Sequence, residues 1–509
     1  MTPEVRQAVI DKHAAHKTPD YQDKLHALNQ KIKTAKDNHK TKVEALFTSE
    51  DIKEAWKGMK ELTGMNKRKK DPSILNEPGS AQCLNKFYAR FDCVDCSVEL
   101  DAIRSNLVTV VNNQNFTLPD NIVRKALCKI KSKKASGPDG MSAKMLKLCR
   151  NSLEPVITKI FELSFSTCTF PATWKIGEIV PIAKKDFPVV DNDLRPVTLT
   201  SVLSKCLERI GLWLLMPFAD KKLDALQFAY VNNKSTDDAV CHLVHRIAKH
   251  LDKNSSHTVR ALYLDYSSAF NTIKPHLLVS KLHNLGVPSY LQLWVLDFLT
   301  ARPQYVRTSQ EKSDFIVLNS GAPQGCVLSP SLFVLYTNDL AHDSDKVFIQ
   351  KYADDTVVVG LCDGEKDTEY LKCVNDVNDW CKTNYLKLNV QKTKELIWDF
   401  RKSKQDREPV RINDMNVEVV PTYKYLGVIM DNKLSFAQHA EGQLVKVQKR
   451  LYCVRSMFKL HIDYTLIRLF YEATIPPLLL YACVAFYGLL TKKIKTDLEK
   501  PKCITERLL

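Results

Sequence analysis

Between Val347 and Gly360, two apolar runs flank a short polar step. An apolar run, Val347–Ile349, enters this stretch and a β-branched run, Val357–Val359, leaves it, and both runs favour strands. A polar step, Tyr352-Ala353-Asp354-Asp355, lies between them. The pattern predicts a β-hairpin that presents Asp354 and Asp355 at its tip.

A second strand is predicted immediately before Asp265. Leu262 and Leu264 are apolar, Asp265 ends the run, and Ala269-Phe270 then opens a helix. Because 89 residues separate Asp265 from Asp354, only tertiary structure can bring these two carboxylates together.

The same signals predict the remaining elements. Residues 1–75 are basic and are expected to be helical, since Leu25, Leu28 and Ile32 are spaced three and four apart. In the first half of the chain, the predictions are a helix over 119–134, a Gly-rich turn over 136–140 before a helix from Ser142, a strand over 178–183, and an extended segment before a helix that Thr200 or Ser201 caps. In the second half, they are an apolar helix from Ser329, one strand over 386–390, another that ends at Trp398, a strand over 423–431 broken at Gly427, and helices over 437–500.

Ile475–Leu490 contains 16 residues without a charge and is the one stretch that needs a membrane check. It is shorter than a usual span, and Pro476 and Pro477 lie near its start. We expect a buried helix and no membrane segment.

Composition adds an expected partner. The chain has 509 residues, and 74 Lys and Arg against 58 Asp and Glu give a net charge of +16. Such an excess favours an anionic partner, most commonly nucleic acid, although a basic surface without function is the alternative. The 15 scattered cysteines and the lack of a signal peptide favour an intracellular, reducing compartment, the cytoplasm or the nucleus.

The paired carboxylates indicate metal chemistry. Asp354 and Asp355 repel each other at the tip of an apolar hairpin, and a hard cation such as Mg²⁺ would stabilise them, whereas a solvated turn is the bland alternative. Lys184, Lys185 and Arg195 end two adjacent extended segments and could clamp a triphosphate, or form surface salt bridges to nearby aspartates. Together with the Gly-rich loop at 321–325, these groups fit two-metal phosphoryl transfer.

Seven motifs in order resemble the reverse transcriptase of LINE-type (non-LTR) retrotransposons. They are SGPDGMSAKMLK, LRPVTLTSVLSK, LDYSSAF, SGAPQGCVLSP, YADD, LNVQKTK and YKYLGVIMD, and the similarity covers about residues 85–435. The resemblance implies an α+β right-hand polymerase with fingers, palm and thumb, the palm being an antiparallel sheet backed by helices. It implies an RNA-directed DNA polymerase with two Mg²⁺ ions, replaceable by Mn²⁺, and with RNA template, DNA primer or target and dNTPs as partners.

The resemblance also assigns roles to single residues. Asp265, Asp354 and Asp355 match the catalytic metal ligands, with the carbonyl of Tyr266 as an additional ligand. Arg195 resembles a triphosphate contact, Gln324 the loop residue near the nascent base pair, and Lys392 a lysine near the leaving phosphate. Apart from the resemblance, Lys184 ends the segment next to Arg195 and is expected to contact the nucleotide with it. Phe270 lies five residues after Asp265, where a ring under the sugar would exclude a 2′-hydroxyl, and an ordinary core aromatic is the alternative. Tyr425, Leu426 and Gly427 match the grip on the primer end.

The expected organisation is a basic helical extension (1–79), fingers and the first part of the palm (80–259), palm (260–435) and a helical, truncated thumb (436–509). Asn271, Val231 and Leu194 depart from the family pattern, and no endonuclease or Cys/His knuckle is seen. A catalytically silent nucleic-acid-binding remnant with the same fold is therefore the alternative function. An RNA-dependent RNA polymerase is disfavoured by Phe270.

Overall fold

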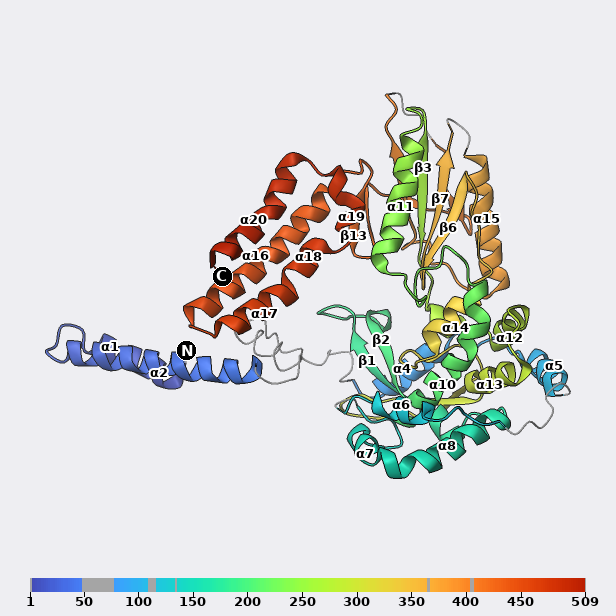
Figure 1. Cartoon of the computed structure of the whole chain (residues 1–509), viewed down its shortest axis with the longest axis horizontal. Coiled ribbons are helices and arrows are strands. Elements are labelled where there is room, and N and C mark those ends of the chain that lie inside the picture. Colours follow the sequence, from blue (N-terminus) through green and yellow to red (C-terminus); the bar gives the residue numbers. More distant parts are fainter. Residues whose placement is uncertain are drawn as a thin grey trace. The chain divides into compact units, whose positions relative to one another are not determined.

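The computed structural model describes residues 2–47, 77–108, 116–132, 135–363, 367–402 and 407–508. It divides into two compact units. One contains residues 70–427 and 431–433, and the other contains residues 1–69, 428–430 and 434–509. Figure 1 traces the elements of both units along the chain.

The helices of the larger unit are α4 (Ser80–Ala89), α5 (Ser97–Val108), α6 (Ile122–Cys128), α7 (Ala143–Leu148), α8 (Arg150–Ser166), α9 (Ala172–Lys175), α10 (Val202–Ala219), α11 (Thr236–Leu251), α12 (Pro275–Asn284), α13 (Ser289–Leu299), α14 (Ser329–Tyr336) and α15 (Thr368–Thr383). Its strands are β1 (Gly177–Ala183), β2 (Leu194–Leu199), β3 (Thr258–Leu264), β4 (Arg302–Val306), β5 (Ile316–Leu318), β6 (Val347–Tyr352), β7 (Asp355–Cys362), β8 (Lys394–Asp399), β9 (Arg411–Ile412), β10 (Met415–Asn416), β11 (Glu418–Val419) and β12 (Thr422–Tyr425).

A five-stranded sheet forms the centre of this unit, in the order β11-β8-β3-β7-β6. β3 pairs antiparallel with both β7 and β8, and β7 pairs antiparallel with β6, whereas β11 runs parallel to β8. Every residue of β3 is buried, as expected for a central strand covered on both faces. Helices α11 and α15 pack on this sheet (Figure 1).

A four-stranded sheet, in the order β2-β1-β4-β5, joins segments from either side of β3 in the sequence. β1 pairs antiparallel with β2 and parallel with β4. One apolar core links the helices around this region to the five-stranded sheet, with Trp294 and Phe333 among its fully buried side chains.

A charged network is buried inside the five-stranded sheet. Arg260 on β3 is 1% exposed and donates to both carboxylate oxygens of Glu395 on β8, at 2.8 and 3.0 Å, and Glu395 is fully buried. Arg260 also donates to Asp367 at 2.8 Å, and Tyr370 donates to Glu395 at 2.8 Å. Burial alone would lower the pKa of Arg260, but these carboxylates outweigh it and raise that pKa above its ordinary value.

The smaller unit is helical. α1 (Pro3–Ala14) and α2 (Tyr21–Phe47) pack together through Val5, Ala8 and Leu28. The C-terminal elements are β13 (Val428–Asp431), α16 (Ala437–Lys459), α17 (Tyr464–Thr474), α18 (Pro476–Leu480), α19 (Cys483–Phe486) and α20 (Lys492–Leu508). Val447, Leu451, Val454, Ile467 and Phe470 form the apolar core of α16 and α17.

Within the described residues, one helical segment, Tyr464–Leu489, is long and apolar enough to cross a membrane, and 28% of its apolar window is buried. The prediction of a single buried helix over 475–490 is wrong. The chain breaks into α18, α19 and a 3₁₀ turn, and Leu480 and Val484 are exposed. Pro476 and Pro477 begin α18, and Ala482, with φ 51°, separates it from α19, so no continuous helix forms.

Most predicted elements are confirmed, with three differences. The helix over 119–134 is shorter, because Asn121 at φ 65° delays its start to Ile122 and it ends at Cys128; residues 133–134 lie outside the described ones. Residues 386–390 are not a strand, since they make only one isolated bridge, Tyr266 to Leu388. Ala269-Phe270 opens a 3₁₀ turn rather than the helix, which starts at Pro275. The predicted break at Gly427 is confirmed, since Leu426 and Gly427, both with positive φ, separate the two strands β12 and β13.

The expected helical character of residues 1–75 is confirmed for the described part. The remainder of that prediction, residues 48–75, lies outside the described residues.

Candidate active site

The β6–β7 hairpin is confirmed and carries the paired carboxylates. Tyr352 pairs with Asp355, which leaves Ala353 and Asp354 as a two-residue turn. Ala353 has φ 57°, a left-handed conformation that two-residue hairpin turns require but that alanine rarely adopts. Asp354 therefore lies in the turn and Asp355 is the first residue of β7, and both side chains are exposed.

Buried polar contacts hold this turn in place. The Gln227 side-chain oxygen accepts hydrogen bonds from the backbone N–H of Ala229 at 2.9 Å and of Ala353 at 3.4 Å. Lys351 is fully buried, forms an ion pair with Asp224 at 2.9 Å and donates to the carbonyls of Thr337 and Leu340 at 2.8 and 2.6 Å. A buried ammonium with this many partners fixes the strand that leads into the turn.

Asp265 follows the last residue of β3, as predicted. Leu264 pairs with Thr356, so the next residues along the two antiparallel strands are Asp265 and Asp355. The Asp265 N–H donates to the Thr393 hydroxyl at 3.3 Å, and the Asp265 carbonyl accepts from Asn389 at 2.8 Å. The pairing of β3 with β7 thus brings together Asp265 and Asp355, which lie 90 residues apart in the sequence.

The carboxylates repel one another. Partial desolvation, together with Asp354 and Asp265, raises the pKa of Asp355 to about 6. Desolvation also raises the pKa of Asp265, Asp354 adds to the increase, and Lys392 opposes it. Three carboxyl groups that disfavour each other's charge in one place provide an oxygen-only donor set that suits Mg²⁺.

Three cations approach the same place from separate segments. Lys392 Nζ lies 4.0 Å from Asp265 Oδ2. Lys184, at the end of β1, has a lowered pKa because of desolvation and of the nearby charges of Lys392 and Arg195. Arg195 on β2 pairs with Ile182 on β1 and is exposed. The predicted nucleotide contacts Lys184, Arg195 and Lys392 therefore form one basic group beside Asp265.

The salt bridges considered as an alternative are partly present. Lys185 pairs with Asp193 at 2.8 Å, and Lys184 donates to the Asn192 carbonyl at 2.6 Å. Lys185 is thus engaged within its own loop, whereas the charge of Lys184 stays close to that of Lys392 and Arg195.

The Gly-rich loop packs closely on β2. The Gln324 carbonyl accepts from the Thr198 N–H at 2.7 Å. Gly325 has φ 130°, and a Cβ there would lie 2.5 Å from the Thr198 oxygen, so only glycine fits. The buried Glu208 carboxylate accepts from the N–H groups of Val327 and Leu328 at 2.5 and 3.2 Å, just before α14. Gln324 is thereby held half-buried at a fixed position.

Phe270 lies in the 3₁₀ turn that follows Asp265. Its ring is half-buried and contacts the Phe333 ring at a centroid distance of 5.4 Å. Its carbonyl accepts from the Ala322 N–H of the Gly-rich loop at 2.7 Å. The Phe270 ring is therefore packed against the core on one side and partly accessible to solvent. The neighbouring Tyr266 is buried and contacts the same Phe333 ring at 6.5 Å.

Tyr425 is buried, and its hydroxyl accepts a hydrogen bond from the side-chain amide of Gln350 on β6 at 3.1 Å. Leu426 and Gly427 follow it with φ 44° and 88°. Tyr423 was not among the predicted site residues. Its ring stacks on Tyr263 at 4.0 Å, and its pKa is raised to about 12 by desolvation and by Asp355 and Asp265. Its alternation with Tyr425 in β12 was the signal that could have revealed it. Gln227 and Lys351 were also missed, because a buried polar side chain leaves no distinct trace in a single sequence.

Comparison with known proteins agrees with this arrangement. Residues 182–430 match the family model for reverse transcriptase (RNA-dependent DNA polymerase). The chain is 29% identical over 332 residues to the RNA-directed DNA polymerase from mobile element jockey of Drosophila melanogaster, a match that covers 62% of this chain and 35% of that protein. It is 26% identical over 439 residues to a probable RNA-directed DNA polymerase from transposon BS of the same organism, covering 82% and 48%. A third relative, the Pol polyprotein of the type-1 retrotransposable element R1 of Bradysia coprophila, is 24% identical over 376 residues, covering 72% and 36%.

Residues 182–430 thus match a reverse transcriptase domain. The resemblance to the reverse transcriptases of LINE-type, non-LTR retrotransposons is confirmed by this match and by relatives named for polymerases of mobile and retrotransposable elements. The chain spans about half, or less, of the length of the curated relatives it matches.

Proposed function

We propose that this chain is an RNA-directed DNA polymerase that adds deoxynucleotides to a primer 3′-hydroxyl. The observation that carries the proposal is the meeting of the ends of β3 and β7, where Asp265, Asp354 and Asp355 adjoin the basic group Lys184, Arg195 and Lys392. Nucleotidyl transfer requires negative charge that can hold cations, next to positive charge that can hold a triphosphate.

The divalent ions would be held by Asp265, Asp354, Asp355 and the carbonyl of Tyr266. When bound, Mg²⁺, or Mn²⁺ in its place, supplies charge neutralisation at the attacking oxygen and at the pyrophosphate leaving group. The raised pKa values of Asp265 and Asp355 support this assignment, since only a cation relieves such repulsion while keeping the carboxylates ionised.

The chain's own side chains would position the substrate. Lys184 and Arg195 contact the triphosphate, and Lys392 approaches the leaving phosphate. Gln324, fixed by the packing of its loop on Thr198, contacts the nascent base pair. Phe270 lies beneath the sugar of the incoming nucleotide and excludes a 2′-hydroxyl.

In the right-hand description, the five-stranded sheet is the palm and the four-stranded sheet with its helices forms the fingers. The proposed boundaries are 80–259 for the fingers and first part of the palm, 260–435 for the palm and 436–509 for a helical thumb. Residues 1–79 form a basic extension. Tyr425, Leu426 and Gly427 would grip the primer end, and an RNA template, a DNA primer or target and dNTPs are the partners.

Primer extension tests the proposal directly. The purified chain is incubated with a poly(A) template, an oligo(dT) primer, dTTP and Mg²⁺. Extension is expected, and Asp354→Asn should abolish it while leaving RNA–DNA binding nearly unchanged. A parent chain that binds the hybrid but never extends it would instead establish a silent nucleic-acid-binding remnant. Equal loss of binding in Asp354→Asn would indicate a structural role for that carboxylate.

A further inference from the structure

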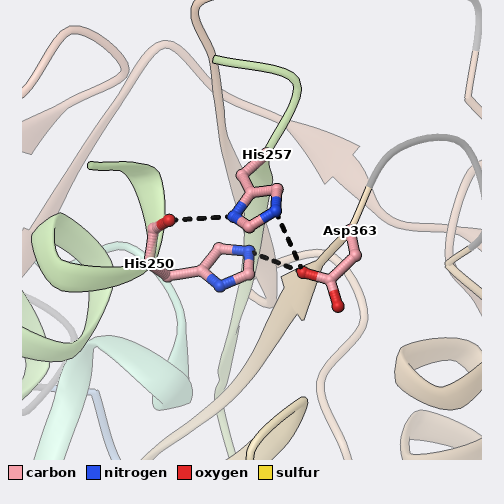
Figure 2. Close-up of side chains that lie close together, drawn as sticks. All are labelled: His250, His257 and Asp363. Atoms are coloured by element: carbon pink, nitrogen blue, oxygen red, sulfur yellow. Dashed lines mark hydrogen bonds and ion pairs between the residues drawn. The ribbon is translucent and has the colours of Figure 1, made fainter. Parts of the chain in front are cut away.

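Three side chains converge at the end of the five-stranded sheet opposite the catalytic carboxylates (Figure 2). His250 lies at the C-terminal end of α11, His257 directly precedes β3, and Asp363 directly follows β7. β3 ends next to Asp265 and β7 begins with Asp355. At about 3.3 Å per residue, the seven steps from Asp355 to Cys362 separate the two sites by roughly 20 Å.

The geometry of this cluster is close. His257 Nε2 and His250 Nε2 lie 3.5 and 3.7 Å from the same oxygen, Asp363 Oδ1. Among the residues that the structure describes, this is the one group of three His, Cys, Asp or Glu side chains whose ligand atoms all lie within 4.8 Å of one another. The two imidazole rings stack with centroids 4.4 Å apart and an interplanar angle of 16°.

Hydrogen bonding fixes the chemistry of His257. Its Nδ1 lies 3.0 Å from the backbone carbonyl of His250, which can only accept, so Nδ1 carries a proton (Figure 2). In the neutral ring, Nε2 then presents a lone pair to the Asp363 carboxylate. Two acceptors face each other at 3.5 Å, and only a cation between them makes that arrangement favourable.

The cation could be a proton on the ring or a metal ion. A proton on His257 would pair only that ring with Asp363. If both histidines were protonated, two positively charged rings would stack 4.4 Å apart and repel each other. His250 Nε2 also lies 3.2 Å from the backbone carbonyl of Cys362, which can only accept, so this nitrogen donates there until a metal ion replaces its proton. A single divalent ion would bind both Nε2 atoms and the carboxylate together, with the His250 proton moved to Nδ1.

We propose that His250, His257 and Asp363 form a binding site for a transition-metal ion, Zn²⁺ by preference. Zn²⁺ binds imidazole nitrogen and carboxylate oxygen at about 2.0–2.2 Å, which in a tetrahedral arrangement sets the ligand atoms roughly 3.3–3.5 Å apart. Two of the three separations in this cluster already approach that value. The Nδ1 bond of His257 to a backbone carbonyl is the orienting contact that metal-ligating histidines usually make. Asp363 is more than half exposed, which gives the ion a path from solvent and water a place in its coordination.

The role of this site would be structural. The ion would tie the end of α11 to the entry of β3 and the exit of β7, the strands whose opposite ends carry the catalytic carboxylates. Its presence does not depend on polymerase activity, so the site can be tested whether or not the chain extends primers.

Zinc uptake by matched variants tests the proposal. The full chain is stripped with a chelator and then titrated with Zn²⁺ against a chromophoric competitor, in excess Mg²⁺ so that the catalytic carboxylates do not contribute. The parent chain is expected to take up one more Zn²⁺ than His257→Gln or Asp363→Asn. Loss of either ligand should weaken this site by more than the roughly 10- to 100-fold that loss of an orienting partner costs.

The control is His245→Gln, which changes an exposed histidine on the same helix α11 and should bind zinc as the parent does. Zn²⁺ should also raise the thermal unfolding midpoint of the parent and of His245→Gln, but not that of the two ligand variants. Because Asp363 is exposed, Asp363→Asn should fold even if His257→Gln does not. Equal zinc uptake by parent and Asp363→Asn, or a midpoint that Zn²⁺ leaves unchanged in the parent, would overturn the proposal and leave a protonated histidine–aspartate pair.

Discussion

Asp355 is the residue in which function and folding conflict most directly. Its pKa of about 6 means that the folded chain binds a proton at this carboxyl more tightly than the unfolded chain does. The folded state therefore loses stability from this group as pH rises from about 4 to about 6, because the carboxylate is then forced to ionise beside its neighbours, and the loss stays constant at higher pH.

Asp355→Asn should remove this penalty. In metal-free buffer at pH 7.5 we expect the variant to unfold at a higher temperature than the parent, and the difference should shrink at pH 4.5. Adding Mg²⁺ should raise the midpoint of the parent and leave that of the variant nearly unchanged. Thermal scans at the two pH values measure this, and a variant less stable than the parent at pH 7.5 would show that the carboxylate is structurally required.

Phe270 gives a second prediction at the scale of a residue. Phe270→Ala should raise the incorporation of ribonucleotides relative to deoxyribonucleotides, because the half-buried ring would no longer fill the space under the sugar. Parallel primer-extension assays with each nucleotide type measure the ratio. Phe270→Leu, which keeps an apolar side chain of similar volume, is the control and should change the ratio less. A Phe270→Ala enzyme that extends primers with the parent's preference would make this residue part of the core only.

Among the elements, the central strand β3 depends on a buried ion pair. Arg260 and Glu395 are almost completely enclosed, and removal of Arg260 leaves the Glu395 carboxylate buried without a counter-charge, although Tyr370 still donates to it. Arg260→Met should therefore destabilise the chain by about 3–5 kcal/mol.

The double variant Arg260→Met with Glu395→Met is the matched control, and it should recover much of this loss because it buries no lone charge. Urea denaturation followed by circular dichroism measures both variants. If the double variant is as unstable as the single one, the loss of stability comes from the broken hydrogen bonds to Asp367 and Tyr370 and not from an unpaired buried charge.

The sequence predicted elements well where side-chain pattern and backbone preference agree. The apolar runs around Asp354 became β6 and β7, and Ser201 caps α10 with a hydrogen bond to Leu203 at 3.2 Å. The prediction failed at 386–390, where alternation of apolar residues arises from packing of an extended loop rather than from strand pairing. It could not reveal the enclosure of Lys351 or Glu208, because those positions depend on partners that lie far away in the chain.

For the candidate site, the motifs led to the carboxylates and cations by residue type and order. What they could not supply was the register that sets Asp265 beside Asp355, or the approach of Lys184 and Arg195 to Lys392. Those depend on the pairing of β3 with β7 and of β1 with β2, which are tertiary facts.

At the scale of the whole molecule, the net charge of +16 predicts how the chain binds nucleic acid. Affinity for an RNA–DNA hybrid should fall at least about 100-fold between about 50 and 200 mM salt, because bound Lys and Arg release counterions from the phosphates. Fluorescence anisotropy with a labelled hybrid measures this slope. Lys184→Gln should lower the slope by about 1, whereas an affinity that stays flat with salt would contradict an electrostatic interface.

The two-residue turn between β6 and β7 gives the hairpin no spare length. Tyr352 and Asp355 are already paired, and successive side chains of a strand point to opposite faces. Loss of one codon from this turn would make every side chain of one strand of the hairpin point to the opposite face of the sheet. Loss of one codon from the loop at 252–256 would shorten that connection and leave the facing of the strands unchanged. In a lineage of decaying gene copies, in-frame codon losses would accumulate in that loop and would be purged from the hairpin for as long as the copies had to replicate.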